Sequence, residues 1–156
     1  MSKPDDDASI VIPAQTDIPC IGAALRRTAN LVTRVYNAYL APAGLEVTQY
    51  SILRKIETGN AGSASELADI VGVERSTLAR NLERLDKLGL VAARSGEGRR
   101  LVYELTPLGI ERLDAARPLW RAAQQAVIDG LPPSYGPQIH EELALLWEAA
   151  RFARRD

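Results

Sequence analysis

Residues on which enzymes, exported proteins and membrane proteins depend are scarce in this sequence. The single cysteine, Cys20, excludes a disulfide framework within the chain and fits a reducing compartment. No apolar run approaches the roughly 18 residues of a membrane-spanning helix, and no basic-then-apolar leader begins the chain. We therefore expect a cytoplasmic protein without a membrane partner, and 156 residues suffice for one domain with helical extensions.

Groups that perform catalysis are equally sparse. The single histidine, His140, lies in a helical run beside Glu141 and Glu142, where we expect a solvated surface residue. The GxSxG, Walker, HExxH and CxxC motifs are missing, and metal-ligating residues are not clustered. We expect that the protein is not an enzyme and needs neither a cofactor nor a metal ion.

What the sequence does contain is a local excess of positive charge. Between Arg75 and Arg100 it has seven arginines or lysines against three acids, while the whole chain has a formal charge of -1. A basic patch on an otherwise neutral protein indicates a site for a polyanion.

Two short helices are predicted at this patch. Ser63 and Glu66 have the spacing of a capping box, and Gly72 suits the left-handed residue that ends a helix. A second helix begins within residues 74–76. Its apolar stripe consists of Leu78, Leu82 and Leu85. Its polar face and flanks consist of Ser76, Thr77, Arg80, Asn81, Glu83, Arg84 and Lys87.

A β-hairpin follows, because the β-favouring runs 90–94 and 101–105 flank the turn 95–98. Two helices followed by such a ribbon predict a winged helix-turn-helix. The fold class is therefore mainly α with a small β-hairpin wing.

The flanking segments read as helices that need a partner. Residues 20–40 are apolar over more than one face, which is typical of a helix that buries two surfaces. Thr48 is expected to cap the next helix, and Thr106 the long one that begins at Pro107. A breaker-rich turn at 130–137 precedes the last helix. Apolar surface on the first and last helices would make a monomer prone to association, so we expect a homodimer.

The residues before Cys20 lack a helical period. Asp5, Asp6 and Asp7 indicate a flexible acidic arm over 1–18. An alternative is that Ile10, Val11 and Ile12 form a short strand or a strap over a partner subunit.

These motifs resemble the MarR family of bacterial transcriptional regulators. The resemblance covers roughly residues 20–115. The matching motifs are G-L-E-V-T-Q-Y-S-I-L-R, S-A-S-E-L-A-D-I-V-G-V, R-S-T-L-A-R-N-L-E-R-L-D-K-L-G-L-V and V-Y-E-L-T-P-L-G. Glu97 stands where the family usually has an aspartate before the wing arginine, here Arg99. With the helix pattern, the resemblance implies dimerisation helices over 19–45 and 107–156 and a DNA-binding domain over 46–106.

The resemblance and the polar face together predict contacts with double-stranded DNA at a pseudo-palindromic operator. The first half of the second helix would enter the major groove, where arginine reads guanine and asparagine reads adenine. The base-edge or phosphate candidates there are Ser76, Thr77, Arg80 and Asn81. Arg84, Arg94 and Arg100 are candidates for phosphates, and Arg99 for the minor groove or for support of the wing. The alternative for each arginine is a solvated surface role.

The family also implies a small-molecule effector that releases a repressor from DNA. The candidate lining consists of Tyr36, Tyr39, Tyr50 and Trp120, which suits an aromatic or phenolic ligand, although these residues could equally be core and interface. One branch of the family senses peroxides through a cysteine near the start of the first helix. Cys20 is therefore a candidate redox sensor, although it falls about two residues early.

An alternative to the DNA-binding function is that the winged helix binds a partner protein. Fold alone does not separate the two readings. The arginine-bearing polar face favours DNA, because a helix that docks on protein more often exposes apolar anchors.

Overall fold

The computed structural model describes residues 20–59, 63–95 and 101–153, and this part of the chain is mainly helical with one antiparallel hairpin. The fold class predicted from the sequence is confirmed. The elements are α1 (Ile21–Leu40), the short 3-10 helix η2 (Ala41–Ala43), α2 (Val47–Glu57), α3 (Ala64–Val71), α4 (Arg75–Lys87), β1 (Val91–Ser95), β2 (Leu101–Leu105), α5 (Pro107–Asp129) and α6 (Tyr135–Ala153). The acidic arm predicted over 1–18 lies outside the described residues.

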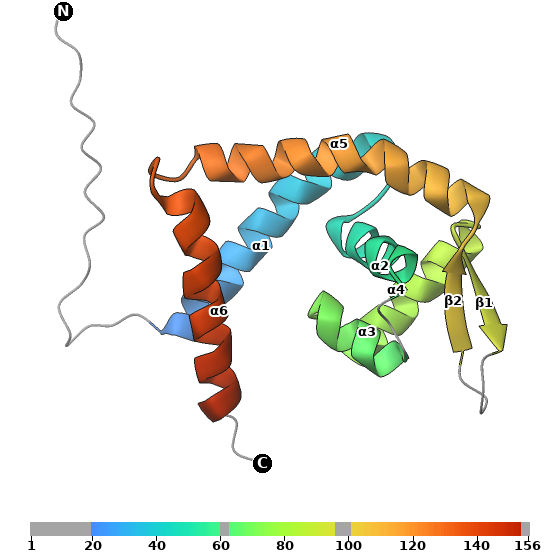
Figure 1. Cartoon of the computed structure of the whole chain (residues 1–156), viewed down its shortest axis with the longest axis horizontal. Coiled ribbons are helices and arrows are strands. Elements are labelled where there is room, and N and C mark those ends of the chain that lie inside the picture. The colour runs from blue at the N-terminus through green and yellow to red at the C-terminus, as the bar shows by residue number, and fades with distance from the viewer. Residues whose placement is uncertain (1–19, 60–62, 96–100, 154–156) are drawn as a thin grey trace, which may run out of the picture.

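Helix α5 connects the two ends of the molecule (Figure 1). One end holds α2, α3, α4 and the wing formed by β1 and β2, and the other holds α6. Helix α1 packs along α5. The helix-turn-helix and the wing therefore lie beside the first half of α5, and its second half extends beyond them toward α6.

Side-chain caps fix several helix ends where the sequence predicts them. The Ser63 hydroxyl accepts a hydrogen bond from the Glu66 amide at 3.2 Å, and Gly72 ends α3 with φ +75°. The Thr106 hydroxyl accepts from the Gly109 amide at 3.0 Å, with Pro107 in the first turn. Such caps satisfy amides that the first helical turn leaves without partners.

Two predicted boundaries are wrong. The N-cap of α2 is Glu46 and not Thr48, because the Gln49 side chain accepts from the Glu46 amide at 3.0 Å and the Asn37 side chain accepts from the Val47 amide at 2.8 Å. Helix α6 starts at Tyr135, inside the turn predicted over 130–137. The amides of the first turn have no partner within the helix, so Pro137 costs no helical hydrogen bond and does not delay the helix.

The apolar stripe of α4 is buried as predicted, in the core between the helix-turn-helix, the wing and α5. Its members Leu78, Leu82 and Leu85 are between 0% and 3% exposed. The core around them also contains Leu40, Ile52, Leu53, Leu67, Leu90, Val91 and Leu113. Because this stripe is turned inward, the polar residues on the other side of α4 face outward.

The start of α5 touches the base of the wing at Gly109. A Cβ added to Gly109 would lie 2.0 Å from the Leu90 carbonyl oxygen, so only glycine fits there. The same carbonyl accepts from the Thr106 amide at 3.1 Å, and the Thr106 hydroxyl donates to the Gly89 carbonyl. The base of the wing and the start of α5 are thus held together by one backbone hydrogen bond, one side-chain hydrogen bond and the close contact at Gly109.

The outer helices leave apolar surface uncovered in the single chain. Helix α6 has no buried residue, and α1 buries only Tyr36 and Leu40. The large apolar side chains exposed on these two helices are Ile21, Leu25, Leu31, Tyr39, Leu143, Leu145, Trp147 and Phe152. Among the described residues, no helix combines the length and apolar character needed to cross a bilayer.

Candidate nucleic-acid interface

The outward face of α4 carries the predicted DNA-contacting groups. Ser76, Arg80 and Arg84 are exposed, while Thr77 and Asn81 are half-buried. Glu74 is the N-cap and makes no side-chain cap bond, so the amides of Arg75 and Ser76 at the helix start stay available to an acceptor. A helix start with free amides and a neighbouring hydroxyl is suited to bind a phosphate.

Arg80 and Asn81 differ in how free their side chains are. The Arg80 guanidinium is exposed, and its contact with the Thr77 hydroxyl is long, at 3.4 Å. The Asn81 amide donates to the Thr77 carbonyl at 2.9 Å and is half-buried. Arg80 can therefore reach a base edge without losing a strong contact, whereas Asn81 would first have to break its bond to the helix backbone.

Two arginines predicted to contact phosphates, Arg84 and Arg94, form weak ion pairs with acidic side chains. Arg84 lies 3.5 Å from a carboxylate oxygen of Glu46, and Arg94 lies 2.8 Å from Glu104 across the hairpin. These side chains are about half exposed or more, and exposed ion pairs contribute only about 0–1 kcal/mol. A phosphate can replace either partner at little cost.

Two further predicted arginines, Arg99 and Arg100, lie outside the described residues, together with Glu97 and the rest of the wing tip. Lys87, at the end of α4, bonds to Glu83 at 2.7 Å. That hydrogen bond lowers the pKa of the exposed Glu83 carboxyl. This pair is as exposed as those of Arg84 and Arg94, so a phosphate can replace Glu83 as well. Arg80 differs from these residues because it bonds to a neutral group, the Thr77 hydroxyl.

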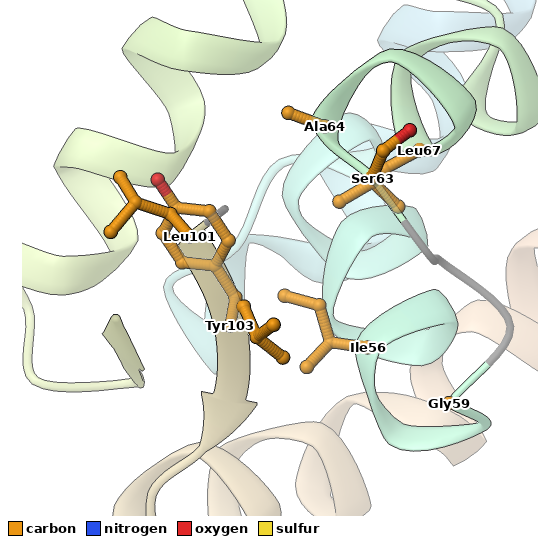
Figure 2. Close-up of a pocket in the computed structure, with 8 residues that line it drawn as sticks. Ile56, Gly59, Ser63, Ala64, Leu67, Leu101 and Tyr103 are labelled. Atoms are coloured by element: carbon orange, nitrogen blue, oxygen red, sulfur yellow. The ribbon is translucent and has the colours of Figure 1, made fainter. Parts of the chain in front are cut away.

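A small apolar cavity underlies the wing. It has a volume of about 100 Å³ and separates β2 from the end of α2 and the start of α3. Figure 2 shows the residues that line it: Leu101 and Tyr103 on β2, Ile56 on α2, and Ser63, Ala64 and Leu67 at the start of α3. Side chains of β2 thus set the position of the wing relative to the helix-turn-helix.

Three of the four aromatic residues predicted to line an effector pocket come together where α1, α2 and α5 meet. Trp120 stacks on Tyr50 with ring centroids 5.8 Å apart, and it lies 6.5 Å from the ring of Tyr36. Tyr39 is on α1 but is 39% exposed. Tyr50 and Tyr36 are buried, so these rings also serve as core.

Gln124 is a member of this cluster that the sequence reading missed. Its side-chain oxygen accepts a hydrogen bond from the Tyr36 hydroxyl. Burial raises the pKa of Tyr36, so the phenol stays protonated and remains a donor. The helical spacing could have predicted this contact, because Gln124 follows Trp120 by four residues and therefore lies on the same face of α5.

Polar contacts link α5 to the segment around α2 near the same cluster. Arg117 on α5 bonds to Glu57 on α2 and to Asp114, and the bond to Glu57 is the main reason that the pKa of Arg117 is raised. Arg112 donates to the carbonyl of Ala43 at 3.1 Å. A rotation of α5 would therefore be transmitted to α2.

Cys20 lies at the start of α1. Cys20 is exposed and occupies the N-cap position of α1 without a side-chain cap bond. Within the described residues, no three His, Cys, Asp or Glu side chains are placed to hold a metal ion.

Comparison with known proteins identifies the family. The model of the MarR family matches residues 43–101, from the end of η2 to the start of β2. The transcriptional regulator MosR of M. tuberculosis is 37% identical, with a TM-score of 0.77 over 85% of this chain and 96% of MosR. The chain belongs to the MarR family of transcriptional regulators. That family consists of regulators and not of enzymes, which agrees with the scarcity of catalytic groups.

Other MarR-like proteins extend the comparison. MosR in a complex with DNA gives a TM-score of 0.78 at 37% identity, over 88% of this chain and all of that one, 100%. The M. tuberculosis MarR family protein RV2887, in a complex with p-aminosalicylic acid, is 26% identical with a TM-score of 0.61, over 85% of this chain and 99% of RV2887. The Bacillus subtilis HTH-type transcriptional regulator YwoH is 32% identical over 76 residues, which cover 49% of this chain and 56% of YwoH.

Proposed function

We propose that this MarR family member is a homodimeric repressor that binds a specific pseudo-palindromic operator and is released by a small aromatic ligand. The observation that carries the proposal is the outward face of α4. Arg80 is exposed at the centre of this polar face, and the leucine stripe on the opposite side of the helix is buried. The structure of MosR with DNA supports the DNA-binding role.

In the proposed complex, the first half of α4 lies in the major groove. Arg80 makes two hydrogen bonds to a guanine, and Ser76 and Thr77 contact phosphates or base edges beside the free amides of the helix start. Asn81 reads a base only after it leaves the Thr77 carbonyl. The phosphate contacts are made by Arg84, Arg94 and Arg100, and the minor-groove or wing contact by Arg99.

Dimerisation places two copies of α4 on one face of the assembly. The segments 19–45 and 107–156 form the dimerisation region, and residues 46–106 form the DNA-binding domain. Helices α1 and α6 carry the uncovered apolar side chains that a second copy would bury. Two copies of α4 must lie about 34 Å apart to meet successive major grooves, so the distance between them determines affinity.

The proposed effector binds at the aromatic cluster of Tyr36, Tyr50 and Trp120, with Tyr39 nearby on α1. A planar aromatic acid or phenol would compete with the stacking of Trp120 on Tyr50 and change how α5 holds α2. The complex of RV2887 with p-aminosalicylic acid supports a ligand of this class. Release follows because the two α4 helices no longer match the grooves.

The test is a fluorescence-anisotropy titration with DNA that flanks the protein's own gene. If the dimer neutralises about eight phosphates, log affinity should fall with log salt at a slope near -7. Addition of aromatic acids should lower the affinity, whereas peroxide should act only if Cys20 is the sensor, and Cys20→Ser should then abolish its effect. An anisotropy signal that does not depend on salt, or no binding to DNA at all, would contradict the proposal and favour a protein-interaction module.

A further inference from the structure

The first turn of α2 lies between the aromatic cluster and the DNA-contacting face of α4. Tyr50, which stacks on Trp120, donates its backbone amide to the Glu46 carbonyl at 2.9 Å. Glu46 is the N-cap of α2, and its carboxylate lies 3.5 Å from the guanidinium of Arg84 on α4. One helical turn therefore separates the stacked rings from an arginine that we expect to contact a phosphate.

Two carboxamide side chains hold this turn in place. The Gln49 side chain accepts a hydrogen bond from the Glu46 amide at 3.0 Å, and Gln49 is buried. The Asn37 side chain on α1 accepts from the Val47 amide at 2.8 Å, and Asn37 directly follows Tyr36 of the aromatic cluster. The turn is therefore tied to α1 as well as stacked on α5, so a ligand in the cluster acts on it from two sides.

Helix α2 lies between α5 and the pair of helices α3 and α4 (Figure 1). It contacts both α5 and α4. The stack of Tyr50 on Trp120 is its contact with α5, and the pair of Glu46 with Arg84 joins it to α4. A planar ligand inserted between the two rings would push the start of α2 away from α5. That movement brings the Glu46 carboxylate closer to Arg84.

Arg84 can bind either of two partners, the Glu46 carboxylate or a DNA phosphate. The pair with Glu46 is long, and its side chains are 65% and 52% exposed, so a phosphate replaces the carboxylate easily. A closer carboxylate would neutralise the guanidinium and occupy its N–H groups, which makes Arg84 a poorer partner for a phosphate. Two alternative arrangements of one side chain are what coupling between two sites requires.

We propose that Glu46 is a positioning residue that transmits ligand binding at the aromatic cluster to Arg84. When the ligand separates the rings, Glu46 approaches Arg84, neutralises its charge and withdraws it from the phosphate. This inference rests on the proposed function. It adds a route that operates within each protomer to the change in distance between the two α4 helices.

The test compares how strongly an aromatic acid weakens operator binding in the wild type and in Glu46→Gln. The quantity measured is the ratio of the operator Kd with p-aminosalicylic acid to the Kd without it, by anisotropy at one salt concentration. Glu46→Gln should lower this ratio by about threefold or more, because the neutral carboxamide no longer competes with the phosphate for Arg84. Glutamine keeps the length of the side chain and an acceptor oxygen, so the packing at the start of α2 is retained.

A second arginine variant and a matched control make the comparison specific. Arg84→Gln should lower the same ratio by a similar factor, and Glu46→Gln with Arg84→Gln should lower it no further, because both substitutions remove one contact. Glu83→Gln is the control. Its carboxylate is on α4, is 63% exposed and pairs with Lys87, so the substitution removes the same charge near the DNA. The ratio for Glu83→Gln should equal that of the wild type.

The outcomes separate this inference from the proposed function. If p-aminosalicylic acid releases the wild type, and Glu46→Gln gives the same ratio as Glu83→Gln, the role of Glu46 is overturned and the ligand-responsive repressor stands. Reductions that multiply in the double variant would also overturn it, because the two side chains would then act independently. A wild type that the acid does not release would contradict the proposed ligand response, and with it this inference.

Discussion

The ring of Tyr50 lies parallel to the indole of Trp120, with centroids 5.8 Å apart and an interplanar angle of 18°. Tyr50 belongs to α2, beside the helix-turn-helix, and Trp120 belongs to α5, the long helix that continues toward α6. The stack therefore joins the DNA-reading part of the chain to the part proposed to hold a second copy. A group that separates the two rings would alter both regions together.

Trp120→Ala should lower the free energy of unfolding by about 2–4 kcal/mol, because it removes a large ring from between two buried tyrosines. Urea denaturation followed by circular dichroism measures the change. Leu88→Ala is the control, since Leu88 is 51% exposed and lies outside the proposed dimerisation region, so its loss should be much smaller. Equal losses in the two variants would show that the stack does not stabilise the junction.

Trp120 should also report the binding of an aromatic ligand. The chain has two tryptophans, so Trp147→Phe leaves Trp120 as the remaining one. We expect aromatic acids that release operator DNA to change the emission of this variant with the same midpoint as the release. A ligand that releases DNA without any change in Trp120 emission would place the effector elsewhere.

Gly109→Ala should destabilise the protein by about 2–4 kcal/mol, because overpacking against a backbone carbonyl cannot be relieved by a rotamer change. The added methyl group would meet the Leu90 oxygen at 2.0 Å. Gly130→Ala is the matched control, because its Cβ would lie 3.4 Å from the Val127 oxygen at φ -79°. Thermal melts of both variants test the prediction, and an unchanged Tm for Gly109→Ala would contradict it.

Tyr36→Phe should cost about 0.5–1.5 kcal/mol near neutral pH, through loss of the bond to Gln124. The pKa of Tyr36 is raised above its ordinary value of 10.0, so the contribution of the hydroxyl is complete below that pH and is lost as pH rises through the folded pKa. The difference between wild type and variant should therefore shrink as the pH rises above 10.0. The control Tyr39→Phe, at a residue that is 39% exposed, should cost less in urea titrations near neutral pH.

Much of the fold could be predicted from the sequence because local chemistry determines it. Leu78, Leu82 and Leu85 recur at helical spacing, and burial of that stripe leaves a single outward face for α4. Ser63 and Thr106 cap helices at the predicted positions because their hydroxyls need only an amide three residues later. The residues that determine a helix cap or an apolar stripe lie within a few positions of one another, so the sequence alone reveals them.

What the sequence did not disclose depends on contacts between distant segments. The cap of α2 moved to Glu46 partly because Asn37, ten residues earlier, satisfies the Val47 amide. The pairs Arg84 with Glu46, Arg117 with Glu57 and Tyr36 with Gln124 also join separate helices. No local pattern specifies which of several exposed acids an arginine meets, so those partners became visible only in the folded chain.

If Arg80 reads a base at the centre of the α4 face, its removal should lower the specificity of DNA binding. Operator affinity and affinity for unrelated DNA are measured by anisotropy at one salt concentration for wild type, Arg80→Ala and the control Arg26→Ala. We predict that Arg80→Ala loses about 1–3 kcal/mol on the operator and much less on unrelated DNA, so that specificity falls. Arg26→Ala should match wild type on both. Equal losses on both DNAs, or an unchanged operator affinity for Arg80→Ala, would contradict the assignment.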